Sequence, residues 1–210
     1  MPDLRFEDAA GATRGAVVCG IDEAGRGPLA GPVVAAAVIL PSPLPPELTA
    51  AINDSKALSK RQREALEPVL RRTAGFGIGR AEAAEIDAIN ILQATFLAMA
   101  RALADLSRQA GRVPDIALVD GNRPPPLVCP VRTIVRGDSL SLSIAAASII
   151  AKVERDRIMA ALARTWPGYG WEQNAGYPTA AHRAALVRLG ASPEHRRTFA
   201  PVSELVAATT

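Results

Sequence analysis

Four carboxylates in this chain lie at or just beyond the ends of apolar segments that have the composition of buried β-strands. They are Asp22 and Glu23 after a first segment, Asp120 after a second and Asp138 after a third. Two like charges about 4 Å apart repel by roughly 4 kcal/mol at an effective dielectric constant near 20. The adjacent acids at 22 and 23 therefore require a neutralising cation, and the candidates are a divalent metal ion or Arg26.

The position of these acids predicts a metal site. Ligands of open α/β sheets commonly lie at strand ends, and Mg²⁺ prefers oxygen ligands. Two such ions about 3.5–4 Å apart can hold a phosphodiester for in-line attack by water. Each acid alone has a simpler explanation: Asp138 as a helix N-cap, Asp120 as a turn residue, and Asp22 and Glu23 as a solvated strand end. Three strand ends that all carry acids favour the metal site.

The adjacent pair poses a geometric problem, because neighbouring residues of a regular strand point to opposite faces of the sheet. We therefore expect the chain to leave strand geometry at Asp22 and Glu23, so that both can reach one metal centre. Gly25 and Gly27 make such a bend possible.

The elements that must position the acids follow from the hydrophobic pattern. Apolar residues at three- and four-residue steps predict a long core helix, and short apolar runs between turn residues predict strands. The order of hairpin, strand, helix, strand, strand and helix predicts an α/β fold with a mixed sheet flanked by helices. The predicted strands are Val17–Ile21, Val33–Leu40, Phe76–Arg80, Ile116–Val119 and Val131–Val135. The predicted helices are a short charged helix capped at Ser59, Ala83–Gln109 ended by Gly111, one from about Ser139 or Leu140 to Arg164, and a last one from a Thr179 cap to Leu189.

Both tryptophans and both tyrosines lie in the Gly-rich segment from Trp166 to Pro178, which we expect to be a loop. Trp166, Tyr169 and Trp171 are better explained as a hydrophobic plug at the end of the sheet. Tyr177 lies between a glycine and a proline, and we expect it to contact a ligand, since aromatic faces stack on sugars and bases.

The rest of the C-terminal region carries weaker signals. His182 is expected to be structural. The basic tail Ser192–Pro201 contains His195 and two arginines that either contact phosphates or are solvated.

Composition sets the remaining limits. The chain has 210 residues, which suits one domain, and a net charge of +3 that is too small to prove a nucleic-acid partner. Only three of its 24 cationic residues are lysines, so Lys56 and Lys152 either supply a compact point charge or are ordinary surface lysines. Cys19 and Cys129 suit buried, reduced thiols in the cytoplasm. No run approaches the roughly 20 apolar residues of a membrane span, and no export signal is apparent.

A long motif resembles a known family. The segment Gly20–Val33, which reads Gly-Ile-Asp-Glu-Ala-Gly-Arg-Gly-Pro-Leu-Ala-Gly-Pro-Val, resembles the signature of type 2 ribonuclease H (ribonuclease HII). The similarity continues in family order over almost the whole chain. The further matching segments are Asn53–Lys56, Val119–Asn122, Gly137–Ser139, Ala151–Val153, Gly176–Thr179 and Arg196–Phe199.

The resemblance implies a ribonuclease-H-like catalytic core at 1–165 and a small C-terminal part at 166–210 made of the aromatic loop, a helix and the basic tail. It implies an endonuclease that cuts RNA within RNA/DNA hybrids and cuts 5′ of single ribonucleotides in duplex DNA. We expect a cytoplasmic monomer without membrane contact. The rivals are another two-metal nuclease of the same fold, such as a resolvase, and a non-catalytic hybrid-binding module.

The resemblance also assigns residues. Asp22, Glu23, Asp120 and Asp138 match the four catalytic carboxylates, which bind two Mg²⁺ or Mn²⁺ ions. The residues that match substrate contacts are Gly25, Arg26 and Gly27, which sense the 2′-hydroxyl, Tyr177, which packs on the sugar, and Ser55 and Lys56, which contact phosphate.

Two positions depart from the family pattern. Ala57 and Ala175 stand where lysines are frequent in the family, so a weaker affinity for nucleic acid is expected.

Overall fold

Five strands form one mixed sheet in the order β3-β2-β1-β4-β5. The computed structural model describes residues 1–53 and 58–208. Strands β1, β2 and β3 pair antiparallel, whereas β4 and β5 are added in parallel on the other side of β1. The predicted mixed α/β sheet is confirmed. The strands are β1 (Val18–Ala24), β2 (Val33–Ile39), β3 (Gly75–Ala81), β4 (Ile116–Asp120) and β5 (Val131–Ile134).

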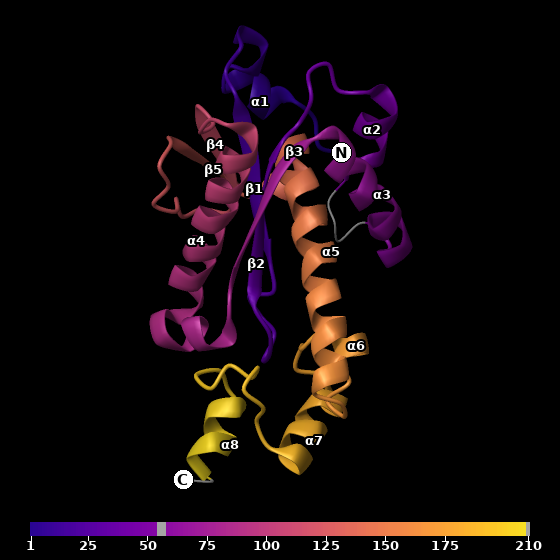
Figure 1. Cartoon of the computed structure of the whole chain (residues 1–210), viewed down its shortest axis with the longest axis vertical. Coiled ribbons are helices and arrows are strands. Elements are labelled where there is room, and N and C mark those ends of the chain that lie inside the picture. The colour runs from indigo at the N-terminus through magenta and orange to yellow at the C-terminus, as the bar shows by residue number, and fades with distance from the viewer. Residues whose placement is uncertain (54–57, 209–210) are drawn as a thin grey trace.

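Two long helices cover the two faces of this sheet, α4 on one side and α5 on the other (Figure 1). Helices α2 and α3 pack on the same side as α5. The helices are α1 (Arg5–Ala9), α2 (Pro46–Ala51), α3 (Lys60–Thr73), α4 (Ala83–Ala110), α5 (Leu142–Thr165), α6 (Trp171–Asn174), α7 (Ala180–Leu189) and α8 (Val202–Ala208), with short 3-10 turns η1 (Ala12–Arg14) and η2 (Gly137–Ser139).

Strand β2 shows how the sheet separates two cores. Its residues are buried on both faces, and they alternate between the cores as the two-residue period of a strand requires. Val33, Ala35 and Ala37 belong to the core under α4, whereas Ala36 and Val38 belong to the core under α5. The small side chains let both helices approach the sheet closely.

The glycines of β3 serve the same purpose. A Cβ atom at Gly77 would overlap the backbone of Leu106, and one at Gly79 would overlap the backbone of Ala98. These glycines are therefore contact points for α4. Their spacing does not fit the glycine pattern of a dinucleotide-binding loop.

Helix α4 is the one helix in the described part of the chain that could cross a membrane by length and composition. Its apolar stripe, including Ile86, Met99 and Leu103, packs against the sheet, as in the core helix of a globular domain. The helix is interrupted at Asn90, with φ 67° and ψ 164°, and ends at Gly111 as predicted.

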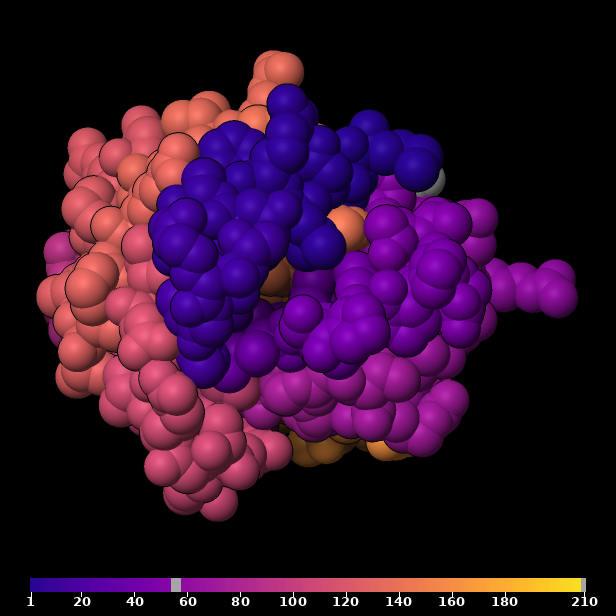
Figure 2. Space-filling view, turned by 90° about the horizontal axis from the view of Figure 1, so that it is seen from above, coloured from indigo at the N-terminus to yellow at the C-terminus, as the bar shows by residue number. Residues whose placement is uncertain are grey.

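The N-terminal residues surround a hollow at the end of the molecule shown in Figure 2. This cavity of about 640 Å³ is lined by Leu4, Leu40 and Pro43 among others. At its edge the buried Glu7 accepts hydrogen bonds from the backbone and hydroxyl of Ser143 at 2.9 and 2.6 Å. The N-terminal segment is thereby tied to the first turn of α5.

The C-terminal region differs from the sequence prediction in two respects. The predicted loop contains the short helix α6, and α8 follows α7, which is therefore not the last helix. Tyr169 and Trp171 are buried beside Met159, with ring centroids 5.0 Å apart, so the predicted plug is confirmed for these two. The division at residue 165 stays a prediction.

The first two basic residues of the C-terminal tail are buried and do not face solvent or a ligand. His195 and Arg196 are 1 % and 0 % exposed. The expectation that the tail contacts phosphate or is solvated was therefore wrong for both residues. His195 is held by Ser192 and His182, which are close to it in the sequence. Arg196 is held by carbonyls of the segment from Gly25 to Gly31, far away along the chain.

Candidate metal and nucleic-acid site

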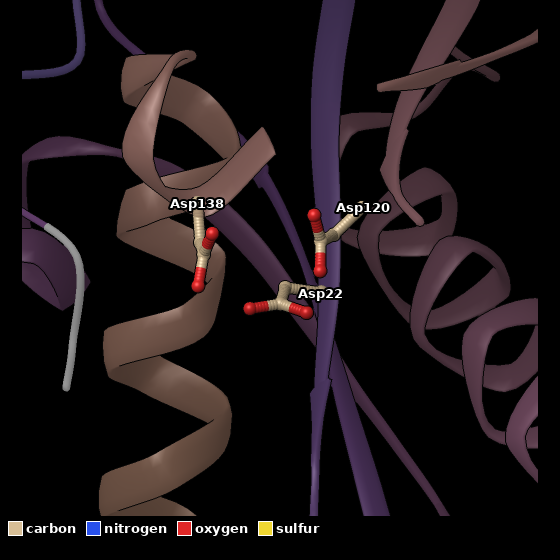
Figure 3. A group of neighbouring side chains, drawn as sticks. All are labelled: Asp22, Asp120 and Asp138. Atoms are coloured by element: carbon tan, nitrogen blue, oxygen red, sulfur yellow. The ribbon is translucent and has the colours of Figure 1, made fainter. Parts of the chain in front are cut away.

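Three of the four predicted acids converge. Each of Asp22, Asp120 and Asp138 offers a carboxylate oxygen, and these oxygens lie within 4.8 Å of one another. Figure 3 shows Asp138, on the turn before α5, facing Asp22 on β1, with Asp120 beside them at the end of β4. Asp22 and Asp138 are buried, and Asp120 is half-buried.

Backbone contacts hold this cluster together. Strands β1 and β4 run parallel and in register, so their acidic ends meet at the same edge of the sheet. The N–H of Gly137 donates to the carboxylate of Asp120 at 2.6 Å, which joins the end of β4 to the turn that carries Asp138. Ser148 of α5 hydrogen-bonds to the carboxyl of Asp22. The sequence carries no signal for Ser148, because the role of this residue depends on how α5 lies over β1.

The electrostatics of the cluster call for a cation. Burial raises the pKa of Asp22 well above its ordinary range, and the nearby charges of Glu23 and Asp120 raise it further. In this cluster all the candidate ligand atoms are carboxylate oxygens, and burial and mutual repulsion disfavour their ionised forms. A hard divalent ion fits such a cluster, because it stabilises the ionised carboxylates.

The predicted departure from strand geometry was wrong. Strand β1 continues through Ala24, and Asp22 and Glu23 pair with Ala36 and Ala35 of β2. Their side chains therefore point to opposite faces of the sheet, Asp22 toward α5 and Glu23 toward α4. The antiparallel ladder with β2 keeps the strand regular, and the flexible glycines come after it.

Glu23 consequently lies outside the cluster of three aspartates and lines a neighbouring pocket of about 300 Å³ beside α4. Asp120 lines the same pocket, so it borders both faces. Arg26 pairs with Glu23 at 3.3 Å. Of the two candidate cations, Arg26 thus accompanies Glu23, and a metal ion fits the aspartates.

A second pocket of about 150 Å³ lies on the α5 side. Asp22, Glu23 and Gly25 line it together with basic side chains, which form its cationic wall. Arg63 and Lys152 belong to that wall, and Lys152 also pairs with Asp156 at 2.7 Å. Such a wall suits a phosphate next to the acids. Lys152 was among the two lysines noted in the sequence, whereas Arg63 carried no signal there.

Tyr177 lines this second pocket and is 44 % exposed. It lies beside Gly27, where an added Cβ atom would be 3.9 Å from the tyrosine ring. The structure thus brings Tyr177 next to the Gly-Arg-Gly segment, as a shared role requires. Ser55 and Lys56 lie outside the described residues.

A buried network holds the backbone of Tyr177. His182 Nδ1 donates to the carbonyl of Tyr177 at 2.9 Å, while His182 Nε2 accepts from Trp171 at 3.0 Å. His195 lies 3.2 Å from His182 and accepts from the N–H of Ser192. Burial lowers the pKa of both histidines, that of His195 to about 4, so both are neutral at physiological pH. His182 is structural, as predicted.

Comparison with known proteins shows the family. The sequence model of "Ribonuclease HII" matches residues 19–202. The chain is 60 % identical over 205 residues to ribonuclease HII of Paramagnetospirillum magneticum, covering 97 % of this chain and 98 % of the relative. It is also 60 % identical over 210 residues to ribonuclease HII of Rhodospirillum rubrum, covering 99 % and 93 %.

Solved structures agree with this assignment. The crystal structure of ribonuclease H2 from Pyrococcus horikoshii OT3 matches with a TM-score of 0.74 and 27 % identity, covering 91 % of this chain and 97 % of that one. Bst-RNase HIII in complex with Mn²⁺ shares the fold, with a TM-score of 0.75 and 21 % identity over 93 % of this chain and 70 % of that one. The sheet, the clustered acids and these similarities together place the chain in the ribonuclease HII family, as a metal-dependent endoribonuclease that hydrolyses the RNA strand of RNA/DNA hybrids.

Proposed function

We propose that this enzyme also cuts 5′ of single ribonucleotides embedded in duplex DNA, by two-metal-ion catalysis that leaves 5′-phosphate and 3′-hydroxyl ends. The single observation that carries the proposal is the convergence of the three aspartates beside an exposed tyrosine and a cationic wall. The same pocket thus offers groups for a metal, a phosphate and a sugar.

The proposed assignment of the four acids to two ions follows from the opposite directions of the Asp22 and Glu23 side chains on β1. Asp22 and Asp138 would hold an ion on the α5 side, Glu23 would hold one on the α4 side, and Asp120 borders both. When bound, Mg²⁺ or Mn²⁺ supplies an activated water and stabilises the leaving 3′-oxygen. A relative of the same fold has been solved with Mn²⁺.

Recognition of the ribose is assigned to Gly25, Arg26 and Gly27 together with Tyr177. The 2′-hydroxyl is the only group that distinguishes the target from DNA. Backbone polar groups of a Gly-Arg-Gly turn can approach it closely, and the tyrosine ring can pack on the sugar. Ser55 and Lys56 are proposed to contact phosphate.

The setting proposed for the enzyme is the cytoplasm, where it would act as a monomer. Cys19 and Cys129 are buried free thiols, which agrees with a reducing compartment.

The test is cleavage of a DNA duplex that contains one ribonucleotide. We expect a single cut on its 5′ side with Mg²⁺ or Mn²⁺ and no cut with EDTA, read from end-labelled strands on a sequencing gel. An all-DNA duplex of the same sequence is the control. An intact ribonucleotide duplex under both metals, or cutting in EDTA, would refute the proposal, and cutting of the all-DNA duplex would favour another two-metal nuclease.

Replacing Tyr177 with alanine should lower the cleavage rate about 10- to 100-fold, because loss of one stacking contact is worth about 1–3 kcal/mol. The residue is 44 % exposed, so the melting temperature should change little. Tyr177→Phe keeps the ring and should retain most of the activity. Equal rates for the alanine variant and the wild type would remove the stacking role.

A further inference from the structure

The segment that connects β1 to β2 carries the Gly-Arg-Gly motif and is held by two buried arginines from distant parts of the chain. Arg155 of α5 and Arg196 of the C-terminal tail are 1 % and 0 % exposed. Figure 1 shows this connection, below β1, next to the C-terminal segment. The motif Arg196–Phe199 matched the family, but the proposed function gives it no role.

Both guanidinium groups are satisfied by carbonyl oxygens. Arg155 donates to the carbonyls of Pro32, Ala30 and Ala175 at 3.0–3.2 Å. In the described part of the chain, no ion pair is formed by either arginine. Burial lowers the pKa of Arg155 to about 10 and that of Arg196 to about 9, so both remain cationic at neutral pH.

Arg196 donates hydrogen bonds to carbonyls of the motif itself. Its Nη1 donates to the carbonyl of Arg26 at 2.9 Å, and its Nη2 donates to the carbonyls of Gly25 and Gly31 at 2.5 and 2.9 Å. Its Nε donates to Gly31 as well, at 3.0 Å. Moving a charged group from water into the protein interior costs free energy. An apolar side chain would therefore fill this space at lower cost, if filling space were the only role of Arg196.

These bonds determine where the amide hydrogens of the motif point. In a trans peptide the N–H of one residue points opposite to the C=O of the residue before it. Because the carbonyls of Gly25 and Arg26 both point to Arg196, the N–H groups of Arg26 and Gly27 both point away from it. Within residues 1–53 and 58–208 neither N–H has an acceptor. Two successive N–H groups that face one side form a site for an oxygen atom of an anion or a hydroxyl.

Gly25 is part of the same arrangement. It has φ 95°, and a Cβ atom there would overlap the guanidinium of Arg155. The first glycine of the motif is therefore required by the buried arginine beneath it.

We propose that Arg196 is a positioning residue that determines specificity: it turns the N–H groups of Arg26 and Gly27 outward, so that they donate to an oxygen of the ribonucleotide or its phosphate. The inference rests on the proposed function for its substrate. Arg196 itself touches neither the substrate nor the acids.

The first experiment observes the amides directly. In ¹⁵N-labelled wild-type protein with EDTA, the amide resonances of Arg26 and Gly27 should shift when a duplex with one ribonucleotide is added. They should shift less with the all-DNA duplex. Amides of the wild type that do not respond to the ribonucleotide duplex would overturn the inference, even where the enzyme cuts that duplex.

The second experiment measures kinetics. Arg196→Lys keeps the charge but cannot reach the same set of carbonyls, and we expect its kcat/KM on the ribonucleotide duplex to fall about 10- to 100-fold. The metal concentration for half-maximal rate should stay within about twofold, because the aspartates are untouched. Arg108→Lys makes the same substitution at an exposed arginine in the last turn of α4 and is the matched control.

The outcomes separate the two proposals. Wild-type rates for Arg196→Lys, or a loss that is fully explained by weaker metal dependence, would overturn the positioning role. Failure of the wild type to cut would refute the proposed function, whereas the amide response in EDTA would still report on this inference.

Discussion

Replacing Asp22 with asparagine should reduce cleavage by a factor on the order of a thousand or more, because it removes a ligand from the centre of the acidic cluster. Asparagine has nearly the same shape, so the fold and the binding of the RNA/DNA hybrid should persist. Single-turnover cleavage and hybrid binding, measured in parallel, check this expectation. Asp8→Asn, at an exposed acid of α1, is the matched control.

The same variant should be more stable than the wild type when metal is absent. Burial raises the pKa of Asp22 in the folded state above its value in the unfolded chain. In metal-free protein the stability linked to this group is therefore present below the unfolded pKa and is lost as pH rises through the folded pKa. The amide side chain of the Asp22→Asn variant cannot ionise, so the variant does not lose this stability.

Thermal unfolding in EDTA measures this difference. The melting temperature of Asp22→Asn should exceed that of the wild type near neutral pH, and the gap should close as the pH falls toward 4. Added Mg²⁺ or Mn²⁺ should stabilise the wild type much more than the variant. Undiminished cutting by the variant, or equal stabilisation of both proteins by metal, would remove Asp22 from the metal site.

Replacing Gly20 with alanine should destabilise the protein by about 3 kcal/mol, the upper range for overpacking a core. A Cβ atom at Gly20 would overlap backbone atoms of Ser143 and Ile144 in the first turn of α5. Backbone cannot move aside as a side chain can, so the helix must shift as a unit. That shift would also separate Asp22 from Asp138, which lies just before the helix, and so weaken the binding of metal.

Urea denaturation of the metal-free protein and metal titration of the folded protein check the two parts of this prediction. Gly75→Ala is the matched control in the same sheet, since an added Cβ atom there would lie 3.7 Å from its neighbours, an ordinary contact. Equal unfolding free energies for the two variants would contradict the close approach of α5 to β1.

The local pattern of the sequence was sufficient to predict the main strands and helices and to identify the family. All five strands and the long helices appear near the predicted places, because their apolar periodicity and their end signals are local properties. Ser59 caps α3 and Thr179 caps α7, each by accepting a backbone N–H of the first turn. The short helices α1, α2, α6 and α8 were missed, because helices of this length depend on tertiary contacts rather than on propensity.

The acids at strand ends could likewise be predicted, since an acid that follows a buried strand along the chain must lie at an edge of the sheet. Only the tertiary structure decided which face each acid takes. Asp22 and Glu23 remain in a regular strand because β2 pairs with both, so they point to opposite sides, while Asp120 borders both the aspartate cluster and the pocket of Glu23.

The tertiary structure also decided how the Gly-Arg-Gly segment is held in place. The sequence by itself determined that this motif, the four carboxylates and Tyr177 belong to one ribonuclease family pattern. It did not determine that Arg196 would be buried beneath the motif, because the carbonyls that satisfy its guanidinium lie 165–171 positions away along the chain. Burial of a charge is decided by such distant partners, and the fold alone brings them together.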